Sequence, residues 1–318
     1  MKKFFLIPAV ALMALASSVS CQKSPSVSEG SVQVTFTVES PVELGTKAIA
    51  DGMKAVELSY AVYNTGKTQH IASLDGATIT KVGDKAWNVS LTLVKSYTYH
   101  IFFWAQTENS TYYTFDKDNG TVTVDYSGDA NDENRDAFCC LFTFTVPTSG
   151  NEFAPAVPVK LTRPFAQINL CATDYDYITE LDLDMTSKIK VSGVANTYDF
   201  LNGTVSGNTD VDFSLAQIPA ELGETINLAG TAYVGMNYIL APENSFDANG
   251  DVVIERSQIN DLEATFAYNG NNVSIVVPNV PYQRNFRTNI VGNFFTGEAQ
   301  IDVIVDNAFF EDDEIVNY

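Results

Sequence analysis

Apolar and polar residues alternate along several short stretches of this chain. An alternation of period two places one face of an extended strand in a core and the other face in water. The first such stretch has apolar residues at Val32, Val34, Phe36 and Val38. Others are Val89, Leu91 and Leu93; Phe138, Cys140, Phe142 and Phe144; Val273, Ile275 and Val277; and Ile301, Val303 and Val305. The pattern predicts a chain made mainly of half-buried strands.

Turn signals separate these stretches. Asn and Gly occur together or in close succession at residues 64–66, 118–120, 202–203, 249–250 and 269–270. Asn-Gly steps accept the positive φ angles that close hairpins. Many short strands with frequent turns predict an all-β protein of antiparallel β-sandwiches.

A break in the strand pattern indicates two tandem domains. Four Pro and Gly residues interrupt the alternation between residues 147 and 158. We therefore expect an N-terminal β-sandwich over residues 31–155 and a C-terminal β-sandwich over residues 156–318. A single larger sandwich is the alternative that the pattern leaves open.

The first twenty residues have the pattern of a secretory signal peptide. Lys2 and Lys3 precede an apolar run that is shorter than the roughly 20 residues needed to span a bilayer. Small residues then lead to Cys21, which predicts a bacterial lipoprotein whose acylated Cys21 becomes the mature N-terminus. Residues 21–30 would form a lipidated tether. The alternative is a plain secretory signal followed by an ordinary cysteine.

Composition excludes some classes of partner. The formal net charge is −21, which argues against nucleic acid and against anionic lipid surfaces, because both attract clustered Lys and Arg. Besides Cys21 the chain has Cys139, Cys140 and Cys171. A disulfide from Cys171 to one of the adjacent pair and three buried thiols are both compatible with the sequence. Their spacing does not indicate a zinc site.

Candidate chemistry is sparse. The sequence lacks the common nucleophile, metalloprotease and nucleotide-binding motifs, and its two histidines are His70 and His100. His100 lies in an aromatic-rich strand pattern and is expected to be structural. The acid-rich loops at 116–120 and 129–136 fit solvated turns better than calcium loops. We expect no enzyme, metal or cofactor. Trp87 and Tyr112 are candidates for stacking on a sugar, although such residues more often fill β cores.

Three stretches of the second half carry a family resemblance. They are residues 159–170 (VKLTRPFAQINL), 238–242 (YILAP) and 285–292 (NFRTNIVG). Together with the lipoprotein start, they resemble the fimbrillin-like lipoproteins, which are type V pilin subunits. The resemblance implies two transthyretin-like β-sandwiches and assembly into surface fimbriae.

The resemblance also implies a mechanism that can be placed on this sequence. A protease would cut after a basic residue behind the first strand, and the best-placed peptide bond joins Lys47 to Ala48, with Lys54 as a second candidate. Loss of the first strand, with Val32, Val34, Phe36 and Val38, would open an apolar groove. A donor strand near the C-terminus of another subunit would fill that groove by β-strand addition. In this chain the candidate donor residues are Ile301, Val303 and Val305.

The resemblance therefore predicts a surface-directed fimbrial subunit. Its partners would be other fimbrial subunits, in a homo- or hetero-polymer, and the outer membrane, which it would reach through acylated Cys21. The simpler interpretation keeps the first strand, the lysine and the last strand in one monomer. A monomeric lipoprotein that binds carbohydrate or another ligand is the rival function.

Overall fold

The computed structural model describes residues 30–41, 52–179, 185–217, 230–268, 270–296 and 301–306, and in these ranges the chain is all-β. The helical segments described there are one turn of α-helix, α1 (Asp176–Thr179), and the 3-10 turns η1 (Ala72–Leu74) and η2 (Glu133–Arg135). None of the described helices has the length and apolar character that crossing a membrane requires. The all-β, sandwich-type fold predicted from the alternation is confirmed.

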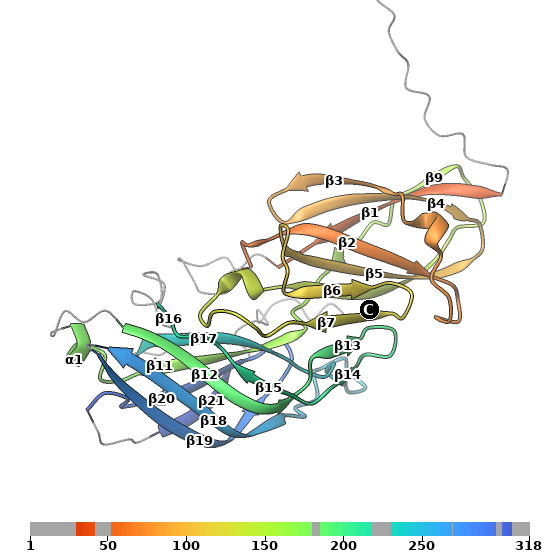
Figure 1. The fold of residues 1–318 in the computed structure, drawn as a ribbon. Helices are drawn as coiled ribbons and strands as arrows, with labels where there is room; N and C mark the ends of the chain where they lie inside the picture. The colour runs from red at the N-terminus through yellow and green to blue at the C-terminus, as the bar shows by residue number, and fades with distance from the viewer. Residues whose placement is uncertain are drawn as a thin grey trace, which may run out of the picture.

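The N-terminal sandwich consists of two sheets that face each other (Figure 1). In the outer sheet the strand order is β10-β1-β4-β3, and β9 also pairs with β1. The inner sheet has the order β2-β5-β8. The outer strands are β1 (Ser31–Glu39), β3 (Thr78–Gly83), β4 (Ala86–Val94), β9 (Glu152–Phe153) and β10 (Val159–Lys160), and the inner strands are β2 (Ala55–Tyr63), β5 (Thr98–Thr107) and β8 (Phe138–Thr145).

The C-terminal sandwich also pairs two sheets around a core (Figure 1). Their strand orders are β17-β11-β20-β21 and β15-β12-β18-β19, and β16 pairs with β12. The first sheet contains β11 (Phe165–Ala172), β17 (Ala232–Leu240), β20 (Arg287–Gly292) and β21 (Ile301–Asp306). The second contains β12 (Met185–Val194), β15 (Thr209–Asp212), β16 (Ala216–Gln217), β18 (Ser257–Tyr268) and β19 (Asn271–Tyr282).

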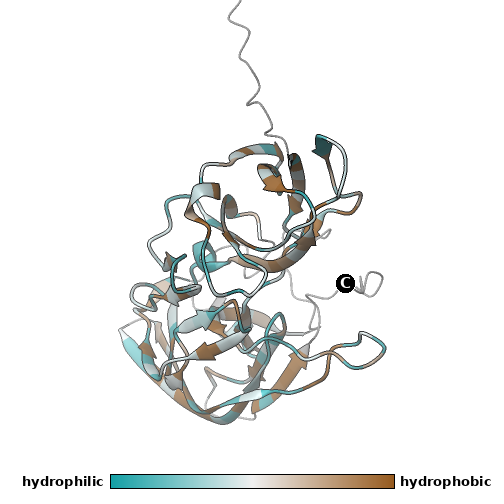
Figure 2. Ribbon diagram, turned by 90° about the vertical axis from the view of Figure 1, so that its right-hand side faces the viewer, coloured by the Kyte–Doolittle hydropathy of each residue, from teal (hydrophilic) through white to brown (hydrophobic). Residues whose placement is uncertain are grey.

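Alternating side chains build both cores, as the sequence pattern predicts. Figure 2 shows apolar and polar positions following one another along the strands of both sandwiches. Strand β11 is different, because all of its residues are buried, as are those of its neighbour β17. It lies between β17, to which it is antiparallel, and β20, to which it is parallel. Strands with a parallel neighbour are usually covered on both faces.

The three stretches that carry the family resemblance become neighbouring strands in β11, β17 and β20. Phe165 pairs with Leu240, and Gln167 pairs with Arg287. The Nε of Arg287 donates a hydrogen bond to Oε1 of Gln167 at 3.2 Å. Two residues further along both strands, Nδ2 of Asn169 donates to Oδ1 of Asn289 at 2.8 Å. These bonds satisfy polar groups that the sheet buries, which explains why the motifs mix apolar with polar residues.

A small third sheet joins the two sandwiches. Its strand order is β14-β13-β7-β6, in which β6 (Tyr113–Asp116) and β7 (Thr121–Val124) come from the first half, and β13 (Thr197–Asp199) and β14 (Thr204–Ser206) from the second. We call it the bridging sheet. The rings of Phe102 and Phe200 stack beside it, with centroids 3.7 Å apart. Gly120 closes the β6–β7 turn at φ +68°, and a Cβ there would collide with Leu201.

Buried charges reinforce the same junction. Arg163, just before β11, forms a two-contact ion pair with Asp136: Nε lies 2.8 Å from Oδ1 and Nη2 lies 2.9 Å from Oδ2. Both side chains are only 2 % exposed. Arg284 reaches across from the second half, and its Nη2 lies 3.1 Å from Sγ of Cys139. Its guanidinium also lies over the ring of Tyr198. The two sandwiches thus share a buried core and are not connected by a linker alone.

The junction does not follow the sequence break closely. Val159 and Leu161, which come after the break, pack in the core of the N-terminal sandwich. Residues 126–130, which come before the break, contact the second half of the chain. The Oη of Tyr126 accepts a hydrogen bond from the backbone N–H of Leu240 at 3.0 Å. The boundary at residues 155 and 156 stays a prediction.

The cysteines of the described part are thiols. Cys139, Cys140 and Cys171 are free, and Cys139 and Cys171 are buried. Burial raises the pKa of Cys139 to about 11 and that of Cys140 to about 12. Both thiols are therefore protonated at neutral pH and unreactive. Of the two possibilities left open by the sequence, the structure has free thiols, of which Cys139 and Cys171 are buried and Cys140 is half-buried.

The buried ion pair gives a testable contrast with an exposed one. Asp136→Asn leaves the buried guanidinium of Arg163 without this counter-charge, so we expect a loss of about 3–5 kcal/mol in the free energy of unfolding. Asp212→Asn removes the partner of Lys188, a half-exposed surface pair, and should cost about 1 kcal/mol or less. Denaturant titration of both variants measures the difference. Equal losses would contradict the role given to Arg163 and Asp136.

Candidate functional site

The candidate site is β1, the strand that the sequence analysis places nearest the tether. It lies inside its sheet, not at the edge (Figure 1). On one side all of its residues pair antiparallel with β4, from Ser31 opposite Val94 to Glu39 opposite Ala86. On the other side it runs parallel to β9 and β10. Removing β1 would therefore split the sheet in the middle.

The inner face of β1 is completely buried. Val32, Val34, Phe36 and Val38 are all 0 % exposed. Phe36 occupies an aromatic pocket, in which its ring centroid lies 6.3 Å from that of Phe103, 6.0 Å from that of Phe142 and 5.0 Å from that of Phe144. These partners come from β5 and β8 of the facing sheet. We call this the Phe36 pocket.

The outer face of β1 is polar and carries cross-strand pairs with β4. Oγ1 of Thr35 lies 2.9 Å from Oγ of Ser90, and Oγ1 of Thr37 donates to Oδ1 of Asn88 at 3.1 Å. Pairs of this kind each contribute modestly to sheet stability. They also fix the register, because a shift of one residue would turn the apolar face outward.

The parallel side of β1 is held at two short places. Gln33 and Val34 pair with β9, and Val38 and Glu39 pair with β10. The backbone N–H of Leu161 donates to the carbonyl of Glu39 at 2.8 Å. Nζ of Lys160 also lies 2.5 Å from Oε2 of Glu39. The site without β1 would be a groove with β4 on one side, β9 and β10 on the other, and the aromatic side chains of β5 and β8 as its floor.

The predicted donor strand lies at the other end of the described chain. Strand β21 pairs antiparallel with β20, and within the described residues it is the last strand of its sheet. Ile301 and Val303 pack against the C-terminal core, whereas Ile304 on the opposite face is 42 % exposed. Val305 is half-buried. The described structure thus keeps β21 on its own sandwich as an edge strand, and edge strands can pair with other chains.

The sites of processing are only partly described. Cys21, Lys47 and Ala48 lie outside the described residues. The second candidate, Lys54, is exposed in the turn before β2. Lys47 falls in the interval between Pro41 and Gly52, where the chain passes from β1 to β2. In the sequence, therefore, β1 lies between the lipid attachment site and the predicted cutting site.

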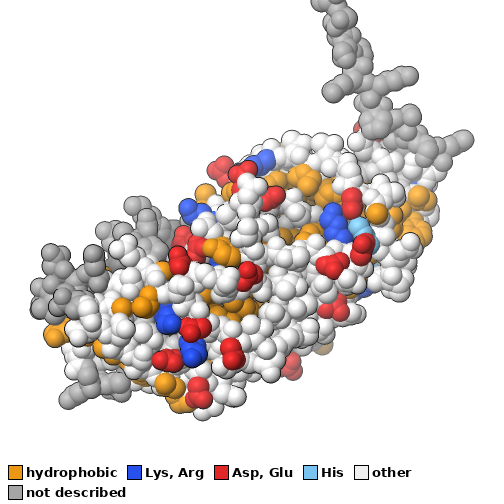
Figure 3. Space-filling model, in the orientation of Figure 1, with side chains coloured by type: hydrophobic (Ala, Val, Ile, Leu, Met, Phe, Trp, Pro, Cys, Tyr) orange, Lys and Arg blue, Asp and Glu red, His pale blue; other side chains and the backbone are white. Residues whose placement is uncertain are grey.

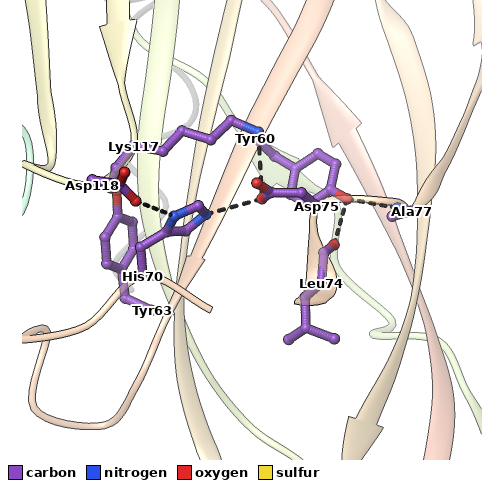
Figure 4. A network of polar contacts seen from close by, with 8 residues as sticks. All are labelled: Tyr60, Tyr63, His70, Leu74, Asp75, Ala77, Lys117 and Asp118. Atoms are coloured by element: carbon purple, nitrogen blue, oxygen red, sulfur yellow. Dashed lines mark hydrogen bonds and ion pairs between the residues drawn. The ribbon is translucent and has the colours of Figure 1, made fainter. Parts of the chain in front are cut away.

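The histidines serve the framework. Nδ1 of His100 lies 2.9 Å from Oγ1 of Thr143, and its Nε2 lies 3.0 Å from the carbonyl oxygen of Thr65. His70 connects two loops, because its Nε2 lies 3.0 Å from Oδ1 of Asp75 and its Nδ1 lies 3.0 Å from Oδ1 of Asp118 (Figure 4). Both imidazoles thus form hydrogen bonds that join separate strands and loops of the framework.

The network around His70 attaches the bridging sheet to β2 (Figure 4). The Oη of Tyr63 donates to the carbonyl of Lys117 at 2.5 Å, and Nζ of Lys117 lies 3.3 Å from Oδ1 of Asp75. The Oη of Tyr60 donates to the carbonyl of Leu74 at 2.6 Å. Burial, with the nearby carboxylates of Asp116 and Asp75, raises the pKa of Tyr63, so its hydroxyl keeps the proton that it donates.

The candidate residues for sugar stacking are used inside the protein. Trp87 is 2 % exposed and belongs to the N-terminal core. Tyr112 donates a hydrogen bond to Oδ2 of Asp132 at 2.5 Å, and the guanidinium of Arg135 lies 3.9 Å from the centre of its ring. Burial and that hydrogen bond raise the pKa of Tyr112 to about 12. Trp87 is closed to a sugar by burial, and Tyr112 is half-buried with Arg135 over its ring, so the rival function gains no support from them.

The sequence matches the model of one protein family but no curated protein. A search of curated proteins finds none that matches this sequence. The sequence model of a family described as "Family of unknown function (DUF6562)" matches residues 25–317.

Solved structures of low sequence identity resemble the chain. A "putative cell adhesion protein" from Bacteroides ovatus ATCC 8483 matches with a TM-score of 0.50 and 9 % identity, over 86 % of this chain and 96 % of that one. The tip fimbrial protein Mfa3 from Porphyromonas gingivalis, with a C-terminal truncation, matches at 0.44 and 11 %, over 87 % and 99 %. A fimbrial assembly protein from Parabacteroides distasonis ATCC 8503 matches at 0.41 and 12 %, over 87 % and 98 %. Fimbrial proteins are thus among the similar structures. At these identities the likeness concerns the fold alone.

The burial of Phe36 can be tested against its polar neighbour Thr35. Phe36→Ala should lower the free energy of unfolding by about 3–5 kcal/mol, because it leaves a cavity among three aromatic rings. Thr35→Ala loses only a surface hydrogen bond and should cost about 1 kcal/mol or less. Denaturation followed by tryptophan fluorescence suits the measurement, since Trp87 and Trp104 both lie in the N-terminal half. Similar losses in the two variants would show that β1 is not held by its inner face.

Proposed function

The chain belongs to this family of unknown function, DUF6562, and we propose that it is a surface-directed lipoprotein that serves as a structural or accessory subunit of a fimbria. One observation carries the proposal. The first described strand after the tether, β1, fills an apolar groove in the middle of a sheet, with all four inner side chains fully buried. A strand in that position can be exchanged for an equivalent strand of another subunit.

The first step is anchoring. Acylation of Cys21 would attach the chain to the outer membrane, and residues 22–30 would link the lipid to β1. The composition fits an exposed protein that binds no nucleic acid. On the face shown in Figure 3, acidic side chains are scattered, and the basic ones lie beside them without forming a patch.

The second step is a cut between Lys47 and Ala48. It would separate residues 21–47, which include the lipid site and β1, from the rest of the chain. The cut alone does not empty the groove. Burial of each Val or Phe stabilises β1 by roughly 1.5–3 kcal/mol, so its four inner side chains together contribute roughly 6–12 kcal/mol. The severed strand therefore stays bound until a competing strand replaces it.

The third step is exchange. A donor strand would enter the groove, pair with β4 on one side and with β9 and β10 on the other, and place alternate apolar side chains where Val32, Val34, Phe36 and Val38 had been. Strand β21, with Ile301, Val303 and Val305, is the proposed donor to the groove of another subunit. Its position at a sheet edge within the described residues supports this assignment. The product is a chain of fimbrial subunits with a role in adhesion, and no step in it requires this chain to act as an enzyme.

Limited proteolysis tests the cut. Native mature protein treated with trypsin should yield a fragment that begins at Ala48, because Lys47 lies in the predicted exposed connection between β1 and β2. Lys47→Gln should remove this product, and Lys54→Gln, the matched control, should leave it unchanged. The severed fragment that contains β1 and ends at Lys47 should co-elute with the body in native buffer and separate from it in denaturant. A native protein that trypsin leaves intact, or cuts first at Lys54, would contradict processing at Lys47.

A further inference from the structure

We propose that the groove of β1 selects a donor strand with an aromatic side chain at the position of Phe36, and that its natural occupant is a strand of a different protein and not β21 of a second copy of this chain. The inference rests on the proposed function, because it concerns the strand that replaces β1. It concerns the identity of the partner and predicts a mixed polymer.

The Phe36 pocket is the reason for the selection. Phe36 meets Phe144 edge to face, with an interplanar angle of 87°, and Phe142 at 75°. Edge-to-face aromatic pairs add stability beyond the area that they bury. The other three inner positions of β1 are valines. The template that the groove fits is therefore apolar, apolar, aromatic, apolar at every second residue.

Strand β21 has no aromatic residue to place at the four inner positions of the groove. In one direction, Ala299, Ile301, Val303 and Val305 would replace Val32, Val34, Phe36 and Val38, so that Val303 enters the Phe36 pocket. In the opposite direction the order is reversed, and Ile301 enters that pocket. A Val or Ile in place of Phe leaves a cavity among the three rings and loses contacts on every side.

Phe309 and Phe310, which follow β21 in the sequence, do not solve this problem. With Phe309 at the Phe36 position, Asn307 and Glu311 would occupy the two neighbouring apolar positions. With Phe310 there, Ala308 and Asp312 would occupy them. Both results hold for either strand direction. Burying a carboxylate in an apolar groove costs far more than the aromatic contact contributes.

The polar outer face of β1 also argues against β21 as the natural occupant of the groove. Thr35 and Thr37 present hydroxyl groups to Ser90 and Asn88. In both directions considered above, Asp302 would take the place of Thr35. Thr37 would be replaced by Ile304 in one direction and by Gln300 in the other. Strand β21 thus matches neither the aromatic pocket nor the hydroxyl pair. A strand with an aromatic residue at the Phe36 position and with Thr or Ser at these two positions would match both.

Displacement of the severed strand tests the inference on the mature protein cut after Lys47. Nine-residue peptides are added, and release of the bound fragment of residues 21–47 is measured by size-exclusion chromatography and mass spectrometry. The probes are the β1 peptide (residues 31–39), its Phe36→Val variant, the β21 peptide (residues 298–306), and its Val303→Phe and Ile301→Phe variants. Gln33→Ala in the β1 peptide is the control, because Gln33 lies on the outer face.

We expect the β1 peptide and its Gln33→Ala control to displace the fragment at similar concentrations. Phe36→Val and the unmodified β21 peptide should need concentrations about 10- to 100-fold higher, the effect expected for underfilling an aromatic site. One of the two Phe variants of the β21 peptide should recover part of this loss, and which of them does so reports the strand direction.

Two results overturn the inference, and they differ in what else they affect. If the β21 peptide displaces the fragment as well as the β1 peptide does, the groove does not select an aromatic residue, although strand exchange itself stands. If not even the β1 peptide displaces the fragment, exchange at β1 does not occur, and the proposed assembly fails together with this inference.

Discussion

Burial of the inner face of β1 is the interaction on which the N-terminal sandwich depends. This strand is flanked on both sides, and its apolar residues fill the space between the outer sheet and the aromatic side chains of β5 and β8. An edge strand could leave with little consequence for its sheet. A central strand cannot leave unless another strand takes its place, because β4 would lose its main-chain partners on that side and the core would open to water. This constraint links stability and assembly in one element.

The second constraint is the coupling between the sandwiches. Strands β7 and β13 pair across the junction, and Phe102, Phe200, Arg163 and Asp136 bury their side chains there. The segment that carries β9 and β10 touches β1 and then leads directly into β11 of the other sandwich. In a polymer of the proposed kind, a pull between the groove of β1 and the donor strand β21 would therefore be carried by paired strands and a shared core, not by a flexible linker.

Much of the fold could be predicted from the sequence because alternation is a strong signal when a strand is long. Strands β1, β4, β8, β19 and β21 all contain the alternating residues that predicted them. Strands β9 and β10 have two residues each, too few to show a period, yet they define one side of the groove. The bridging sheet escaped prediction for a similar reason, since its strands have three or four residues and come from both halves of the chain. The Phe36 pocket could not be predicted from the sequence either, because Phe103, Phe142 and Phe144 are close to Phe36 only after folding.

The central claim is that β1 is a removable strand held in a groove that another subunit fills. The most direct measurement is the N-terminal sequence of this chain recovered from high-molecular-weight assemblies on the cell surface. The account predicts that the chain in these assemblies begins at Ala48 and that residues 21–47 are missing from them. A chain that begins at Cys21 with its lipid still attached, in assemblies that contain β1, would contradict it.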